Sequence, residues 1–335
     1  MTAVRVATFA GPGASPVIRE VPRPEVPRKA ALIQIGACGV CGTDLHILKG
    51  HWPKPLPWPF TLGHELAGVI VEIGPELTHD WSGQPLAVGS KVMLPPLMPC
   101  GTCYWCTHYP ETANKCLTPV YYGRYLGFEK PPHLWGGFAE MVYVDLEELP
   151  GTKIYRLPDD MPLRLGALSE PLTSCIRALS RAQRIGGFRV GDTVVIQGSG
   201  PIGVLAVAAA REMGAGRVIV VGAPEQPRLA LCRRFGAEAT VNTYVEMGQF
   251  TDAGAILTNW HRICTKDLNL LGSWAFTAND LPQGVAMLDR ARDRYPWYEM
   301  QTLFPFTEAG LADAIDAAIA MRTVKSTIVP FEGLG

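Results

Sequence analysis

Four cysteines within 17 residues form the densest group of potential metal ligands in this sequence. Cys100, Cys103 and Cys106 recur at every third position, and Cys116 follows after nine intervening residues. Four thiolates from one loop suit a tetrahedral Zn²⁺ ion in a closed, structural site. We therefore predict a structural zinc held by these four residues, whereas an isolated cysteine such as Cys232 is expected to be a small buried apolar residue.

A second set of potential ligands is dispersed along the chain. Cys41 lies at a predicted strand-to-helix turn, His64 and Glu65 open a later strand, and Glu170 lies in the segment Ser-Glu-Pro. A thiolate, an imidazole and a carboxylate can hold Zn²⁺ and leave one position for water or substrate, as catalytic zinc sites do. Each residue taken alone also fits an ordinary structural role. Their occurrence beside a dinucleotide-binding turn is what favours a catalytic zinc.

That turn follows a buried strand predicted at residues 193–197. It reads Gly198-Ser199-Gly200-Pro201-Ile202-Gly203, leads into a helix ending near residue 213, and is followed by a second strand at residues 217–221. Glycines in this setting allow a tight turn, close approach of a pyrophosphate and close helix–strand packing, and the helix N-terminus supplies N–H donors. The segment predicts dinucleotide binding.

The sequence does not decide between NAD and NADP, because no acidic residue stands directly at the end of the second strand. Glu225 could bind the adenosine ribose, whereas Arg228 could favour a 2′-phosphate. We predict NAD and leave NADP open. The predicted cofactor-binding residues are Gly198, Gly200, Pro201, Ile202, Gly203, Gly222 and Arg228.

The elements that must position these residues change in character along the chain. Short β-like runs separated by Gly and Pro occupy the first half to about residue 155 and predict an irregular, mostly antiparallel barrel-like domain. After a helical stretch, strands alternate with amphipathic helices from Asp192 onward, as in βαβ units. The predicted fold class is α/β, with a Rossmann doubly wound parallel sheet beside the barrel-like domain.

Composition limits the possible functions. The 335 residues are 47% apolar and 18% charged with a formal net charge of -1, so the chain is globular and has no basic excess for nucleic acid. The apolar run at residues 201–210 is too short to cross a membrane, and the first residues show no secretory signal. An odd total of nine cysteines argues against a disulfide framework. We expect a cytoplasmic protein with no nucleic-acid or membrane partner.

The motifs GVCGTDLH, GHELAGVIVEIG, CGTCYWC, GGFAEMV and GSGPIG occur in the order found in medium-chain zinc-dependent alcohol dehydrogenases, and the chain resembles the polyol and threonine dehydrogenase branch of that family. The resemblance implies that Cys41 and His64 bind the catalytic zinc, with Glu170 as a further ligand. Glu65 would lie beside the metal or exchange with Glu170, and Asp44 would orient His64. Which glutamate completes the set stays open.

The resemblance also implies an activity. An alcohol would be oxidised to a ketone or aldehyde by hydride transfer to NAD(P), with Thr43 hydrogen-bonding the reacting oxygen and His46 collecting the proton. It implies a homodimer or homotetramer acting on a small-molecule alcohol or carbonyl. Six loop aromatics could line a cleft, or several of them could be core or interface residues; these are Trp52, Trp58, Tyr121, Tyr122, Tyr125 and Trp135. If some face the zinc, the pocket is apolar and favours a bulky or cyclic secondary alcohol.

The resemblance also implies the domain organisation. A GroES-like catalytic domain comprises residues 1–160 and 278–335, with a zinc lobe at 95–120, and a Rossmann domain comprises residues 161–277.

The sequence departs from the Rossmann pattern at one place. Strands predicted at residues 239–242 and 244–247 are separated by Thr243 alone, although a parallel crossover needs a dozen or so residues. We therefore expect a helix–strand–helix segment to be missing between Thr243 and Tyr244. If the gap is genuine, the alternative function is that of a non-catalytic, zinc-stabilised protein of the same fold. If the protein binds no zinc, the alternative is a quinone or enoyl reductase of related fold.

Overall fold

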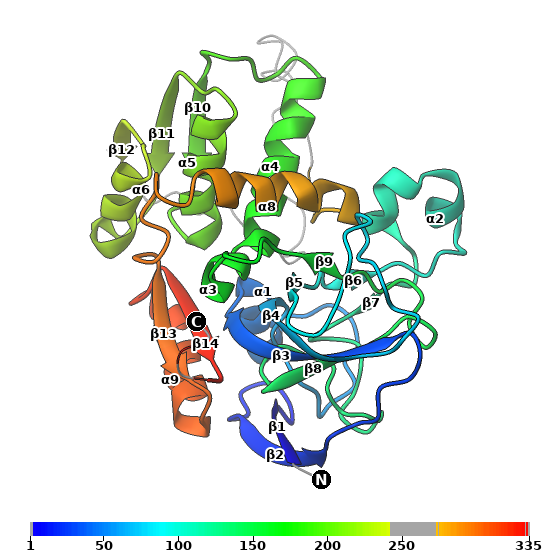
Figure 1. Cartoon of the computed structure of the whole chain (residues 1–335). Coiled ribbons are helices and arrows are strands. Elements are labelled where there is room, and N and C mark those ends of the chain that lie inside the picture. The colour runs from blue at the N-terminus through cyan, green and yellow to red at the C-terminus, as the bar shows by residue number, and fades with distance from the viewer. Residues whose placement is uncertain (1–2, 242–272, 274, 332, 334–335) are drawn as a thin grey trace. The chain divides into compact units, whose positions relative to one another are not determined.

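A computed structural model of the chain describes residues 3–241, 273, 275–331 and 333, which form two compact units (Figure 1). Unit 1 comprises Met1–Thr173 and Phe276–Gly335, and unit 2 comprises Ser174–Ala275. Residues 161–173, which the sequence assigns to the Rossmann domain, fall in unit 1 because α3 (Leu163–Gly166) packs on its strands. The predicted break at Thr243–Tyr244 and the strand at 244–247 lie outside the described residues.

Unit 1 is built on a seven-stranded sheet whose strands run in the order β13-β14-β3-β4-β5-β9, with β8 also paired to β3. The strand bounds are β3 (Ala30–Gly39), β4 (Glu65–Ile73), β5 (Lys91–Met93), β8 (Met141–Asp145), β9 (Tyr155–Arg156), β13 (Gln301–Pro305) and β14 (Lys325–Val329). β13 and β14 are parallel and the remaining pairs are antiparallel. Within the described residues this sheet is open, so the predicted barrel-like domain is not a closed barrel.

The central strand β3 is buried at nine of its ten positions. Its register with β4 shifts between Ile35 and Ala37, which places Gly36 at an irregularity of the ladder. A side chain at Gly36 would lie 2.2 Å from Leu163 Cδ1. Glycine at this position therefore lets α3 pack directly on the strand.

The other elements of unit 1 are short. Two small antiparallel sheets pair β1 (Ala3–Thr8) with β2 (Val17–Pro22) and β6 (Leu97–Met98) with β7 (Val120–Tyr121). The helices are α1 (Gly42–Leu48), α2 (Tyr104–His108), η1 (Pro110–Lys115), η3 (Ala278–Asp280), α8 (Leu281–Arg290) and α9 (Glu308–Ile319). α9 connects β13 to β14 and packs on both, as a parallel crossover requires.

Unit 2 contains three parallel strands in the order β10-β11-β12, the arrangement of the first half of a doubly wound sheet. The strands are β10 (Thr193–Gln197), β11 (Arg217–Val221) and β12 (Ala239–Val241), and the helices are α5 (Pro201–Glu212), η2 (Glu225–Leu229) and α6 (Ala230–Arg234). α4 (Ser169–Arg184) begins in unit 1 and continues into unit 2. The strands and helix predicted at residues 193–221 are confirmed within a residue or two.

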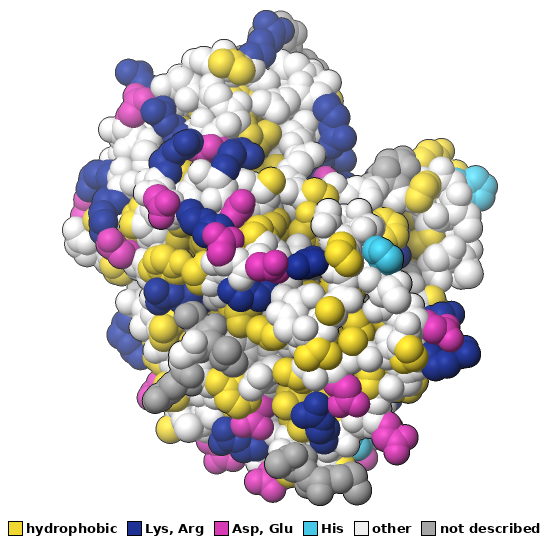
Figure 2. Space-filling model, viewed as in Figure 1, with side chains coloured by type: hydrophobic (Ala, Val, Ile, Leu, Met, Phe, Trp, Pro, Cys, Tyr) yellow, Lys and Arg dark blue, Asp and Glu magenta, His cyan; other side chains and the backbone are white. Residues whose placement is uncertain are grey.

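The largest apolar core fills unit 1, and Trp135, Tyr122 and Phe138 are among its fully buried side chains. Figure 2 shows Lys and Arg interleaved with Asp and Glu on the visible face, in keeping with the net charge of -1. Within the part of the chain that the structure describes, no helix combines the length and apolar character that a membrane span needs.

Candidate active site

Three side chains from two neighbouring segments converge in unit 1. Cys41 is the extended residue that precedes α1, and His64 and Glu65 stand at the start of β4. Their sulfur, ring nitrogen and carboxylate oxygen all lie within 4.8 Å of one another. His64 and Glu65 are 3% and 1% exposed, whereas Cys41 is half-buried. The donor types and their spacing fit Zn²⁺ with one position left open.

The carboxylate of Asp44 contacts both Cys41 and His64. Its Oδ2 accepts a hydrogen bond from the backbone N–H of Cys41 at 2.9 Å, and its Oδ1 lies 3.4 Å from Nδ1 of His64. Burial raises the pKa of Asp44, but the charge of His64 and the hydrogen bonds outweigh it and bring that pKa below its usual value. Asp44 therefore lies where it can orient His64, the position the sequence predicts for it.

Lys325 is a site residue that the sequence analysis missed. It opens β14, is 2% exposed, forms an ion pair with Glu65 and donates from Nζ to the carbonyl of Val40 at 3.0 Å. A side chain at Gly39 would lie 2.3 Å from Oε2 of Glu65 and 2.6 Å from Cε of Lys325. The glycine thus leaves the space that this buried ion pair occupies. A lysine at the head of an otherwise uncharged strand, KSTIV, is the signal that could have revealed it.

Glu170 lies in the first turn of α4 and is half-buried. Its carboxylate is not among the donors within 4.8 Å of one another. Burial raises its pKa to about 7, with His64 opposing and Glu65 reinforcing the rise, so it lies within electrostatic reach of the site. The structure therefore groups Glu65, rather than Glu170, with Cys41 and His64.

Two other cysteines near these motifs do not join the metal site. Cys38 is fully buried in β3, and its thiol points to the carbonyl of Gly39 at 3.8 Å. Cys175 is buried and donates to the carbonyl of Ile202 at 3.5 Å. Neither is in the group of ligand atoms with Cys41.

Thr43 and His46 lie on α1 immediately after Cys41, and both are half-buried. Nδ1 of His46 is buried without a hydrogen-bond partner among the described residues, and its ring centroid lies 6.1 Å from that of His51. Burial, followed by His51 and Lys49, lowers the pKa of His46. A neutral imidazole with an unpaired ring nitrogen is able to accept a proton.

The loop aromatics predicted to line a pocket fall into two groups. Tyr122 and Trp135 are core residues: the Tyr122 hydroxyl donates to the Tyr143 carbonyl at 2.9 Å, and Nε1 of Trp135 donates to a backbone carbonyl at 2.8 Å. Of the two alternatives for these residues, the structure thus shows the core role for Tyr122 and Trp135, whose polar tips are satisfied inside unit 1. Trp58 packs against Phe60, with ring centroids 4.5 Å apart. Trp52 and Tyr121 lie beside Arg124, and the Tyr125 hydroxyl accepts a hydrogen bond from Nε1 of Trp52.

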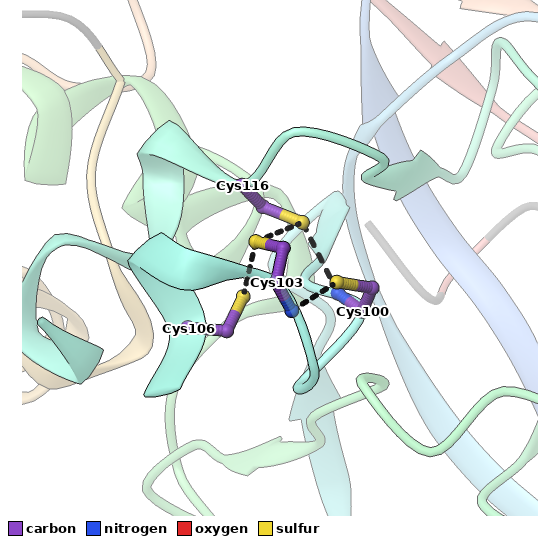
Figure 3. A group of neighbouring side chains, drawn as sticks. All are labelled: Cys100, Cys103, Cys106 and Cys116. Atoms are coloured by element: carbon purple, nitrogen blue, oxygen red, sulfur yellow. Dashed lines mark hydrogen bonds between the residues drawn. The ribbon is translucent and has the colours of Figure 1, made fainter. Parts of the chain in front are cut away.

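The four clustered cysteines come together in one lobe (Figure 3). Their sulfur atoms lie within 4.8 Å of one another, and the backbone N–H groups of Cys100 and Cys103 donate to sulfurs of the group at 3.2 and 3.3 Å. Hydrogen bonds from Thr118 and Thr102 lower the pKa of Cys100 to about 5, while burial raises that of Cys106 to about 12. Four convergent sulfurs fit a tetrahedral structural zinc.

The glycine-rich turn has the close contacts that its sequence predicts. Gly198 has φ +102°, and a side chain at Gly203 would lie 2.0 Å from the carbonyl oxygen of Gly198. Gly200 precedes α5, with Pro201 and Ile202 in its first turn. Glycines at positions 198, 200 and 203 keep the backbone of this turn accessible, as close approach of a pyrophosphate requires.

Two further residues flank this turn. A side chain at Gly222 would meet Ser199 Oγ at 2.8 Å, and a side chain at Gly200 would lie 3.9 Å from Nη1 of Arg228. Glu225, the alternative ribose ligand, forms an ion pair with Arg233. Among the described residues, Arg228 thus places a cation beside the turn.

Comparison with known proteins shows that the chain is similar to dehydrogenases. Residues 27–154 match the alcohol dehydrogenase GroES-like domain. The chain is 34% identical over 259 residues to scyllo-inosose 3-dehydrogenase of Thermotoga maritima, covering 72% of this chain and 60% of that protein. It is 35% identical over 226 residues to 5-exo-hydroxycamphor dehydrogenase of Pseudomonas putida, covering 67% and 58%. The aligned chain thus spans about 60% of the length of these curated relatives.

Solved structures resemble it over nearly its whole length. An alcohol dehydrogenase of Thermotoga maritima has a TM-score of 0.84 at 24% identity and covers 99% of this chain and 100% of its own. The 2R,3R-butanediol dehydrogenase of Bacillus subtilis has a TM-score of 0.77 at 21% identity, with 98% and 100% covered. These likenesses confirm the predicted fold class of a Rossmann sheet combined with a GroES-like domain.

Proposed function

Because the chain belongs to the zinc-type medium-chain alcohol dehydrogenase family, we propose that it oxidises a small-molecule alcohol to a ketone or aldehyde, with hydride transfer to NAD(P). The observation that carries the proposal is the trio of Cys41, His64 and Glu65, whose donor atoms lie within 4.8 Å of one another. Three protein donors of these types leave one position for the alcohol.

The catalytic zinc would be held by Cys41, His64 and Glu65. Glu170 is the alternative ligand, which would replace Glu65 or bind the ion together with it. When bound, the ion supplies Lewis acidity that makes an alcohol more acidic. Asp44 orients the imidazole of His64, and Lys325 offsets the charge of Glu65. The four cysteines of the lobe would hold a second, structural zinc.

Thr43 and His46 would handle the proton of the alcohol. Thr43 Oγ1 lies on the first turn after Cys41, where it can accept a hydrogen bond from the substrate hydroxyl. His46 then takes the proton at its unpaired Nδ1 and passes it toward solvent. Its lowered pKa keeps the ring neutral near pH 7, so it can act as a base.

Unit 2 would hold the dinucleotide at Gly198–Gly203 and Gly222, with the pyrophosphate at the N-terminus of α5. NAD is the proposed cofactor; the position of Arg228 beside Gly200 keeps NADP as the alternative. The proposed substrate is a bulky or cyclic secondary alcohol. The remaining loop aromatics and the cyclic compounds named in the two relatives support this choice.

The test compares two cysteines of one segment. The zinc-loaded protein is screened against cyclic and acyclic alcohols with NAD and NADP, and reduced nicotinamide is followed by absorbance. Cys41→Ser should abolish oxidation and remove one of two zinc ions per chain, whereas Cys38→Ser should keep both. Undiminished activity in the Cys41 variant, or no alcohol oxidised by the zinc-loaded protein, refutes the proposal. Light scattering would test the proposed dimer or tetramer.

A further inference from the structure

Arg124 is a buried cation that the proposed mechanism does not use. It follows β7, is 8% exposed, and its Nε is buried without a hydrogen-bond partner. Within the described residues its guanidinium forms no ion pair with a carboxylate, whereas Asp44 faces His64 and Glu65 faces Lys325. Taking an ionised group out of water without a partner is unfavourable, and buried charges are usually paired with an opposite charge. Arg124 is therefore a candidate to bind an anion.

The backbone places Arg124 next to the metal-binding residues. Gly123 has φ +75°, and a side chain there would lie 2.5 Å from the carbonyl oxygen of Gly63, the residue before His64. The turn that carries Arg124 is therefore pressed against the segment that carries His64. Burial raises the pKa of Asp44, and Arg124 is one of the charges that oppose this rise. Arg124 also opposes the burial that raises the pKa of Glu170.

Two aromatic rings lie beside the guanidinium of Arg124. The Arg124 Cζ lies 4.1 Å from the ring centroid of Tyr121 and 5.3 Å from that of Trp52. Nε1 of Trp52 donates to the Tyr125 hydroxyl at 3.2 Å, which fixes the indole. Rings attract a cation through their faces, but the N–H donors of arginine lie in the guanidinium plane. That plane suits two parallel hydrogen bonds to a carboxylate or a phosphate.

We propose that Arg124 binds an anionic group of the alcohol substrate, a carboxylate or a phosphate carried on the ring or chain that bears the reacting hydroxyl. This inference rests on the proposed function and refines it: the substrate pocket is an aromatic cage around a fixed positive charge, rather than the purely apolar pocket that the sequence predicts. Trp52 and Tyr121 hold the guanidinium in place, and the anion completes its in-plane hydrogen bonds.

The catalytic test uses a matched pair of cyclic secondary alcohols, 3-hydroxycyclohexanecarboxylate and its uncharged carboxamide, with the zinc-loaded full chain. The wild type should prefer the carboxylate in kcat/KM by at least about tenfold, the scale of one charge-assisted pair of hydrogen bonds. Arg124→Gln should lower that preference about 10- to 100-fold, and Arg124→Lys, which keeps the charge without the planar fork, should lower it less. Absence of a preference in the wild type overturns the proposal without recourse to any variant.

The matched control is Arg164→Gln. Arg164 also lies over a ring, 3.9 Å from the centroid of Tyr298, and its Nε is likewise buried without a partner, but it has no part in the proposed site. This variant should leave the preference unchanged. If both variants lower it equally, the effect is a general one of removing a stacked arginine, and the proposal fails.

A binding measurement separates this proposal from the proposed function. Calorimetry should detect cyclohexanecarboxylate binding to the zinc-loaded protein without cofactor, weakened at least about tenfold by Arg124→Gln. Such binding supports the inference even if no alcohol is oxidised. If instead the variant raises the KM for NAD or NADP and leaves carboxylate binding intact, Arg124 serves a cofactor phosphate and the proposal is wrong. Inorganic phosphate as a second probe distinguishes the two anion classes.

Discussion

Replacing Lys325 with methionine tests the buried ion pair that Lys325 forms with Glu65, one of the proposed metal ligands. Lys325 and Glu65 each have 2% of the side chain exposed, and Nζ also donates to the carbonyl of Val40. Lys325→Met keeps most of the aliphatic length but leaves the Glu65 carboxylate without its cation. Removing one partner of a buried pair costs about 3–5 kcal/mol of unfolding free energy. The loss of a donor to Val40 acts in the same direction.

The companion variants complete a double-mutant cycle. Glu65→Gln alone should also destabilise the protein, because Lys325 then becomes the unpaired charge. The double variant should recover most of the loss, since replacing both members of a buried pair is often neutral. A coupling free energy of at least about 2 kcal/mol between the two positions is therefore expected.

Urea denaturation of the chelator-treated protein measures each corner of the cycle, because the bound metal would itself offset the charge of Glu65. Burial lowers the pKa of Lys325, but Glu65 and Cys41 outweigh it, and the net result is a raised pKa. A raised lysine pKa gives stability that is complete below the usual lysine pKa and is lost as the pH rises through the folded value. Measurements near pH 7 thus see the whole effect. A coupling below about 1 kcal/mol would refute the reasoning.

Three further predictions follow from the site. Cys103→Ser should halve the zinc content and lower the melting temperature while the trio at Cys41 keeps its metal, as metal analysis and calorimetry would reveal. Gly123→Ala should reduce the unfolding free energy by about 2–4 kcal/mol, because the new side chain meets a carbonyl and φ is positive; an unchanged urea midpoint would contradict this. His46→Gln should slow alcohol oxidation at least about tenfold. It should also remove the acidic limb of the pH–rate profile, which is expected below the usual histidine pKa because the pKa of His46 is lowered. If this limb persists in the variant, His46 is not the base.

Local motifs were enough to predict several groups of neighbouring residues. Cys100, Cys103 and Cys106 are close in sequence, so one loop can bring their sulfurs together whatever surrounds it. The turn from Gly198 to Gly203 is likewise defined by its own strand and helix. In each case the spacing alone fixes the geometry.

Contacts made by distant strands could not be predicted in this way. Lys325 reaches Glu65 because Thr327 of β14 pairs with Gly39 of β3, a register that no local pattern encodes. Arg124 lies near the metal-binding residues because Gly123 packs closely against Gly63. In the sequence alone, nothing distinguishes its neighbours Trp52 and Tyr121 from the other loop aromatics. The choice between Glu65 and Glu170 stayed open for the same reason: both types bind zinc, and only the fold brings one of them to Cys41.

The division of the chain has a consequence for its biosynthesis. Unit 1 is discontinuous, since Met1–Thr173 and Phe276–Gly335 flank the whole of unit 2. As a nascent polypeptide leaves the ribosome, β3 and β4 emerge long before β14, so Glu65 waits for its buried cation until unit 2 has been translated. Completion of the ion pair between Lys325 and Glu65 is therefore one of the last steps in the synthesis of this chain.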